Sequence, residues 1–161
     1  MADSIKIGIA DLNIVKPPQL ICTIGLGSCV GIAIRDPVLK IGGLVHIMLP
    51  DSTAIKSNAN IAKFADTGIP ELVRMLEEAG CKRSRMEAKI AGGAQMFAFQ
   101  NKSELLGIGK RNVEATKEAL KKLGIPLKAE DTGDTYGRTV TYNPENGEYE
   151  VKTVGKSTKI I

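Results

Sequence analysis

The 161-residue sequence is long enough for one domain with a substantial core, and its 43% hydrophobic and 25% charged residues exclude a disordered chain. The net charge of +4 is mild, with both signs interspersed, which is typical of a solvated surface but would also suit an acidic protein partner. Aromatic residues make up only 4%, too few for the stacking platforms of single-stranded nucleic-acid binding, so we expect no nucleic acid as a partner.

Strand-like segments dominate the first third of the chain. The last of these segments contains a histidine, His46, which lies between apolar neighbours. This last segment is apolar on both faces, so we predict that it lies centrally in its sheet. Strands are predicted over residues 5–9, 20–24, 29–34 and 44–49, separated by Pro17-Pro18, by a turn at residues 25–27 and by Gly42-Gly43.

Helices and strands are mixed in the remainder of the chain. One helix is predicted to start near residue 60, or anew at Pro70, and to end at Gly80; a second is predicted to be capped by Asn112 and to end at Gly124. We therefore expect residues 1–161 to form one α+β domain. Further strands are predicted over residues 88–91, 127–130, 138–142 and 148–154, with a hairpin turn at Asn146-Gly147.

The three cysteines, Cys22, Cys29 and Cys81, have no paired metal-ligand spacing, and the chain has one histidine, so no metal site is expected. A disulfide between two of them is left open. The amino-terminal residues lack the apolar segment of a signal peptide, and reduced thiols in the cytoplasm are the expectation. The apolar stretch 20–34 is too short to cross a bilayer, so no membrane insertion is expected.

A glycine-rich turn leads into Cys29, and this is the strongest chemical feature of the sequence. A thiol becomes a nucleophile when a base or cation lowers its pKa, and His46 lies on the next predicted strand. An antiparallel arrangement would bring the two together if Cys29 begins one strand and His46 ends the next. The pattern equally allows Cys29 as a small buried hydrophobe, His46 as a hydrogen-bonded core residue and Thr23 as an ordinary strand residue.

Two glycine turns, one of them the same turn that precedes Cys29, suggest phosphate or dinucleotide binding only weakly. Val30 stands where the third glycine or alanine of a dinucleotide fingerprint belongs. The segment Gly155-Lys156-Ser157-Thr158 resembles the tail of a phosphate-binding loop but has no room for the helix that should follow. A nucleotide-binding protein is therefore the weakest of the alternatives.

Several segments in one order resemble the CheD family, the chemoreceptor glutamine deamidases of bacterial and archaeal chemotaxis. The resemblance extends from about residue 20 to residue 154, and its most specific parts include Cys29 and His46. The matching segments are residues 23–30, 42–52, 63–66, 88–97, 108–113 and 137–138.

The resemblance implies a catalytic cysteine, histidine and threonine at Cys29, His46 and Thr23. For a reaction at Cys29 we expect backbone N–H groups near Ser28 and Cys29 to form the oxyanion site. The resemblance also implies hydrolytic deamidation of glutamine side chains on chemoreceptor cytoplasmic helices. A glutamyl methyl ester would form the same thioester at Cys29 as a glutamine side chain, so we also expect esterase activity. No metal or organic cofactor is implied. The implied fold is an α/β sandwich similar to the catalytic domain of cytotoxic necrotizing factor toxins.

The family also implies a second partner, the CheC phosphatase, which CheD stimulates. This leaves one alternative of a different class: a non-enzymatic regulator that acts mainly by binding CheC and receptors. Intact Cys29, His46 and Thr23 favour the enzyme.

Overall fold

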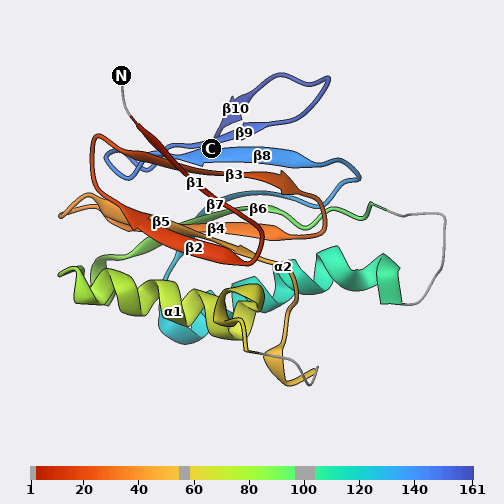
Figure 1. The fold of residues 1–161 in the computed structure, drawn as a ribbon, viewed down its shortest axis with the longest axis horizontal. Helices are drawn as coiled ribbons and strands as arrows, with labels where there is room; N and C mark the ends of the chain where they lie inside the picture. Colours follow the sequence, from red (N-terminus) through yellow and green to blue (C-terminus); the bar gives the residue numbers. More distant parts are fainter. Residues whose placement is uncertain (1–2, 55–58, 97–103) are drawn as a thin grey trace.

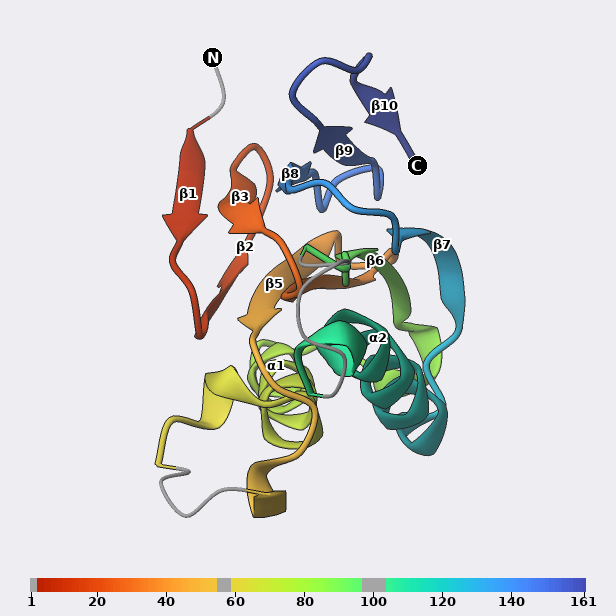
Figure 2. The same ribbon diagram turned by 90° about the vertical axis from the view of Figure 1, so that its right-hand side faces the viewer.

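The structure is a computed structural model that describes residues 3–54, 59–96 and 104–161. It has three layers: an outer sheet, a central sheet and a layer of two α-helices beneath the central sheet (Figure 1, Figure 2). The mixed α+β prediction is confirmed. Phe97, the last residue of one matching segment, lies outside the described residues.

The bounds of the elements follow from short apolar segments divided by turns. In spatial order the outer sheet contains β1 (Ser4–Ile7), β3 (Leu20–Leu26), β8 (Arg138–Tyr142), β9 (Tyr149–Lys152) and β10 (Lys159–Ile160). The central sheet contains β2 (Asp11–Val15), β5 (Ile41–Ile47), β4 (Val30–Asp36), β6 (Glu87–Gly92) and β7 (Leu127–Thr132). The helices are α1 (Ala65–Glu78) and α2 (Glu104–Leu123), with short 3-10 turns η1 (Ser52–Ala54), η2 (Ile61–Lys63) and η3 (Arg83–Arg85).

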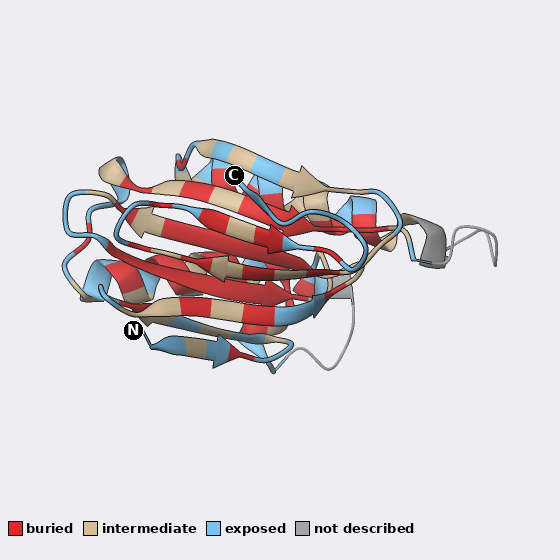
Figure 3. Cartoon of the chain, turned by 90° about the horizontal axis from the view of Figure 1, so that it is seen from above, coloured by how far each residue is buried: buried red, intermediate tan, exposed pale blue. Residues whose placement is uncertain are grey.

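Two apolar cores lie on the two faces of the central sheet. The alternation of side chains along β4 divides its residues, because Ile32 packs toward the helices and Ala33 packs toward the outer sheet. In β5, Val45 and Leu44 divide in the same way. Every residue of β5 is buried, so the prediction of a central strand is confirmed (Figure 3). Its backbone is thereby fixed from both sides and from both faces.

Both predicted helices are present, but the roles predicted for Pro70 and Asn112 at their starts were wrong. α1 runs through Pro70 instead of starting there. Proline removes one hydrogen bond from the first turns, and the burial of the apolar face that includes Leu72 and Leu76 outweighs that loss. Asn112 does not cap α2 but lies inside it, fully buried. An asparagine inside a helix is unfavourable unless its side chain has a partner in the tertiary structure, as it does here.

The turn at residues 25–27 is also placed differently. Leu26 is fully buried and belongs to β3, and the strand stays paired with β8 through an irregularity between Thr23 and Leu26. Gly25 takes a positive φ of 78° at this irregularity, a conformation that glycine adopts without steric cost. The true bend therefore comes later, immediately before β4.

Two strands were not predicted at all. β2 is an edge strand with an alternating exposed and half-buried pattern, and β10 has only two residues. The hairpin predicted at Asn146-Gly147 is confirmed, since β8 and β9 pair antiparallel and Gly147 takes a φ of 80°.

Candidate active site at the ends of β4 and β5

His46 occupies the next-to-last position of β5, between two neighbouring strands. It pairs with Asp11 of β2 on one side and with Gly31 of β4 on the other, and its carbonyl oxygen accepts a hydrogen bond of 2.9 Å from the backbone N–H of Ala10. Its side chain is fully buried and shares the face of Leu44, between the two sheets. The imidazole is therefore held on a rigid backbone.

Thr23, from the outer sheet, contacts His46 across the space between the sheets. Its Oγ1 lies 2.8 Å from Nδ1 of His46 and donates its proton to the carbonyl oxygen of Ile7, 3.0 Å away. A hydroxyl has one proton, so Oγ1 must accept from Nδ1–H. These contacts assign the neutral tautomer that carries its proton on Nδ1, which leaves the lone pair of Nε2 free to accept a proton.

Cys29 lies immediately before β4, two residues before Gly31, which pairs with His46. Positions two apart on a strand share a face, so Cys29 and His46 are diagonal neighbours on the face toward the outer sheet. Cys29 is half-buried and packs against the core between the sheets. Among the described residues Nε2 of His46 has no hydrogen-bond partner, so no hydrogen bond joins it to Cys29 in this structure.

Burial acts on both groups and keeps both uncharged at neutral pH. It raises the pKa of the Cys29 thiol, an effect that the backbone N–H of Cys29 opposes. It lowers the pKa of His46 to about 4. The resting site is therefore a neutral thiol beside a neutral imidazole rather than a thiolate–imidazolium pair, and the thiol needs a base when it reacts.

The bend from Gly27 to Cys29 turns its carbonyl groups toward the protein. Gly27 accepts from the backbone N–H of Ala94 at 2.9 Å, and Cys29 accepts from the N–H of Gly93 at 2.8 Å. The backbone N–H of Cys29 lies near the Cys29 thiol, where it opposes the effect of burial on the pKa. The amides of Ser28 and Cys29 belong to this bend beside the nucleophile, where N–H donors would stabilise a negatively charged oxygen.

Two residues that sequence reasoning did not connect to this site support it. The side chain of Asn112 donates to the carbonyl oxygens of Ser28 and Met48, each at 2.9 Å. Gly92 takes a φ of 118°, and a Cβ there would overlap the carbonyl oxygen of Cys29. The Gly92-Gly93 pair and a mid-helix asparagine were visible in the sequence, but neither shows what it contacts.

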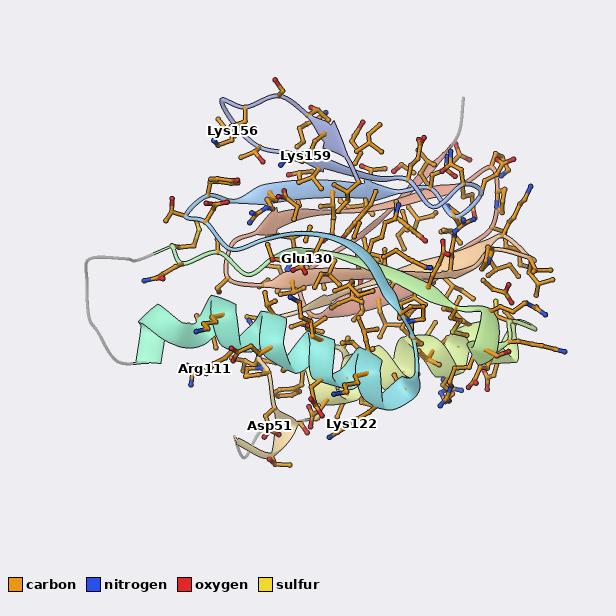
Figure 4. The ribbon with its side chains drawn as sticks, turned by 180° about the vertical axis from the view of Figure 1, so that it is seen from behind. Asp51, Arg111, Lys122, Glu130, Lys156 and Lys159 are labelled. Carbon is orange, nitrogen blue, oxygen red and sulfur yellow. The ribbon has the colours of Figure 1, made fainter. Side chains whose placement is uncertain are left out.

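A sizeable cavity lies away from Thr23, Cys29 and His46. It has a volume of about 800 Å³ and opens between α1, α2 and the segment after β5. Figure 4 shows Arg111 and Lys122 on α2 and Asp51 on that segment near it. Its lining also contains Asp66 and Glu114, so its charges are mixed, and it includes none of Thr23, Cys29 and His46.

No group of three or more histidine, cysteine, aspartate or glutamate residues able to hold a metal ion occurs in residues 3–54, 59–96 and 104–161. No helix within the same residues has the length and apolar character needed to span a membrane.

Comparison with known proteins decides the family. The family model described as CheD chemotactic sensory transduction matches residues 48–153, more than half of the chain. The chain belongs to the CheD family. A relative from Lachnoclostridium phytofermentans is 60% identical over 161 residues, which is 100% of both chains. A relative from Caldanaerobacter subterraneus subsp. tengcongensis is 52% identical over 98% of this chain and 97% of its own. Both are named probable chemoreceptor glutamine deamidase CheD.

The part matched by the CheD family model begins after Cys29 and His46, whereas the alignment with the first relative includes both. Among solved structures, protein NMB0706 of Neisseria meningitidis superposes with a TM-score of 0.51 at 9% identity, over 84% of this chain and 65% of that one. At this identity the likeness concerns the fold alone.

Proposed function

We propose that this protein hydrolyses glutamine side chains of chemoreceptors to glutamate. The observation that carries the proposal is the hydrogen bond between Thr23 and Nδ1 of His46, which leaves Nε2 unprotonated on the face shared with Cys29. The names of the full-length relatives supply the substrate class. Chemoreceptor cytoplasmic helices as the substrate imply that the protein acts in the cytoplasm.

In the proposed reaction Sγ of Cys29 attacks the side-chain amide carbon while Nε2 of His46 takes the thiol proton. The N–H groups of Ser28 and Cys29 hold the oxygen that becomes negative. The carbon–nitrogen bond then breaks, His46 returns the proton to the leaving ammonia, and a glutamyl thioester remains. Water, deprotonated by His46, hydrolyses the thioester to glutamate and restores the thiol.

Thr23 acts as the orienting member of this arrangement. Its Oγ1 accepts from Nδ1–H in the neutral imidazole and in the imidazolium alike, so the ring keeps one orientation through both proton transfers. A glutamyl methyl ester would form the same thioester with loss of methanol, so esterase activity is proposed as well. Neither route calls for a cofactor.

Three further family properties belong to the proposal. We propose that residues 1–161 act as one CheD-like domain, that the CheC phosphatase is a partner and is stimulated by it, and that the α/β sandwich is related to the catalytic domain of cytotoxic necrotizing factor toxins. Full-length alignment with the relatives supports the first. The other two stay predictions from the family resemblance.

The test is incubation with a chemoreceptor cytoplasmic fragment, with ammonia release and Gln-to-Glu changes followed by peptide mapping. Cys29→Ala is expected to abolish both, and His46→Ala to reduce them to a similar level, because an amide needs both nucleophile and base. Cys22→Ala is the matched control: Cys22 is also half-buried but lies on β3 outside the site, and its variant should retain activity. Deamidation by folded Cys29→Ala would overturn the proposal.

The second candidate is a regulator that works by binding alone, and the uncharged resting state that burial gives to Cys29 and His46 favours it. Alkylation separates the two candidates. A catalytic Cys29 should react with iodoacetamide faster than Cys81, which is buried and whose pKa is raised to about 11, and faster than Cys22. Labelling of Cys29 no faster than that of both other cysteines would favour the binding protein.

A further inference from the structure

We infer that Asn112 is a positioning residue of the active site: its carboxamide ties together the strand ends that carry Cys29 and His46 and aims the Cys29 N–H at the oxyanion. The inference rests on the proposed function and extends it to a residue on α2, distant in sequence from the other members of the site. It is carried by the two hydrogen bonds of one fully buried side chain.

Both acceptors are chemically significant positions. Ser28 precedes the nucleophile, and Met48 follows β5 two residues after His46. The NH₂ group of Asn112 has two protons and donates one to each carbonyl oxygen, at 2.9 Å in both cases. One side chain on α2 thus fixes the separation between the end of the nucleophile strand and the end of the histidine strand.

The bond to Ser28 also sets the direction of an amide. In a planar trans peptide the carbonyl and the following N–H point in opposite directions. Because Asn112 draws the Ser28 carbonyl toward α2, the N–H of Cys29 must point away from the helix. The same N–H acts on the Cys29 thiol, where it opposes the effect of burial on the pKa. It is therefore directed at the reacting side chain, as an oxyanion donor must be.

The burial of Asn112 is costly if stability is its only role. Within the described residues its Oδ1 is buried without a hydrogen-bond donor, which is unfavourable for a polar atom removed from water. Asparagine inside a helix is also less favourable than leucine or alanine. Asn112 is therefore unfavourable for stability in two ways, through its unpaired Oδ1 and its low helix propensity, yet it binds two backbone carbonyls. Such a combination is typical of a functional site.

The decisive variant is Asn112→Asp, which has nearly the same size but no NH₂ group. Its matched control is Thr116→Val, which removes another fully buried polar group one turn further along α2 and outside the site. With a chemoreceptor fragment, we expect Asn112→Asp to lower kcat by about a hundredfold with little change in KM, because the loss of one oxyanion donor has that order of effect. Thr116→Val should keep the kcat of the wild type.

A second readout needs no receptor. The rate of Cys29 alkylation by iodoacetamide is measured against pH and located by peptide mapping. Asn112→Asp should shift the midpoint of this profile upward, because a released peptide no longer directs its N–H at the thiolate, and Thr116→Val should not shift it. A merely structural asparagine would lower the free energy of unfolding in urea without moving either kcat of the folded protein or the profile.

Asn112→Ala carries the same test if a buried carboxylate prevents folding, since it introduces no charge, and the measurements are then made at low temperature. Wild-type kcat together with an unmoved alkylation profile in either folded variant would overturn the inference. If the wild type itself leaves receptor glutamines unchanged, the proposed function fails, whereas the alkylation profile still decides whether Asn112 positions Cys29.

Discussion

The buried imidazole of His46 should make the stability of this protein depend on pH in a defined window. The pKa of His46 is about 4 in the folded protein, against 6.5 for an unperturbed histidine. Between these values the unfolded chain binds more protons than the folded one, so stability is complete above about pH 6.5 and falls as the pH falls toward 4. The difference corresponds to about 3 kcal/mol in total, of which about 2 kcal/mol is lost by pH 5.

The assignment to one residue is unusually direct because the chain contains a single histidine. The perturbation is His46→Asn, in which a side-chain NH₂ group replaces Nδ1–H and keeps the hydrogen bond to Thr23 but does not titrate in this range. Carboxylates that begin to titrate near pH 5 are the same in both proteins. Their contribution therefore cancels when the two proteins are compared.

The assay is urea unfolding of both proteins at about pH 7 and about pH 5. We expect the wild type to lose about 2 kcal/mol more than His46→Asn between the two conditions. Equal losses in the two proteins would refute the reasoning, since they would mean that His46 is not held neutral by burial. A larger loss in the variant would have the same consequence.

Two further predictions concern residues around the pair. Thr23→Val should lower kcat between about tenfold and a hundredfold and cost about 1–3 kcal/mol of stability, because Nδ1–H of His46 loses its acceptor; Thr23→Ser should retain most activity, and wild-type kinetics in Thr23→Val would remove Thr23 from the mechanism. In thermal unfolding, Gly92→Ala should destabilise the protein by about 1–3 kcal/mol more than Gly124→Ala, and it should also lose activity. Both glycines have positive φ, but only at Gly92 would a Cβ meet the Cys29 carbonyl. Equal destabilisation by the two substitutions would show that the close approach of Gly92 to Cys29 is unimportant.

The strands nearest the site were predictable because their signals are local. Apolar residues in β5 without alternation indicated its central position, and the short connection to β4 indicated the antiparallel pair. The sequence pattern alone therefore placed the two candidate residues, Cys29 and His46, on neighbouring strand ends. Edge strands such as β2 and β10 carry weak or very short patterns and were missed.

Errors arose wherever tertiary contacts overrode local preference. α1 continues through Pro70 because its apolar face is buried on the central sheet, and Asn112 lies inside α2 because its side chain has partners on two other elements. Helix-capping rules judge both residues by their sequence neighbours alone. These rules do not include the stabilising contacts that a residue makes with another layer of the fold.

The sequence by itself determined the α+β class and the hairpin of β4 and β5, and it allowed Cys29 and His46 to meet at the ends of these strands, since alternation and turn chemistry are properties of adjacent residues. Only the tertiary structure decided the state of that histidine. Its burial, its tautomer and its contact with Thr23 depend on how the outer sheet packs on the central one, and the contacts of Asn112 depend on how α2 packs on the opposite face. Such contacts join residues that are distant along the chain, and no local pattern records them.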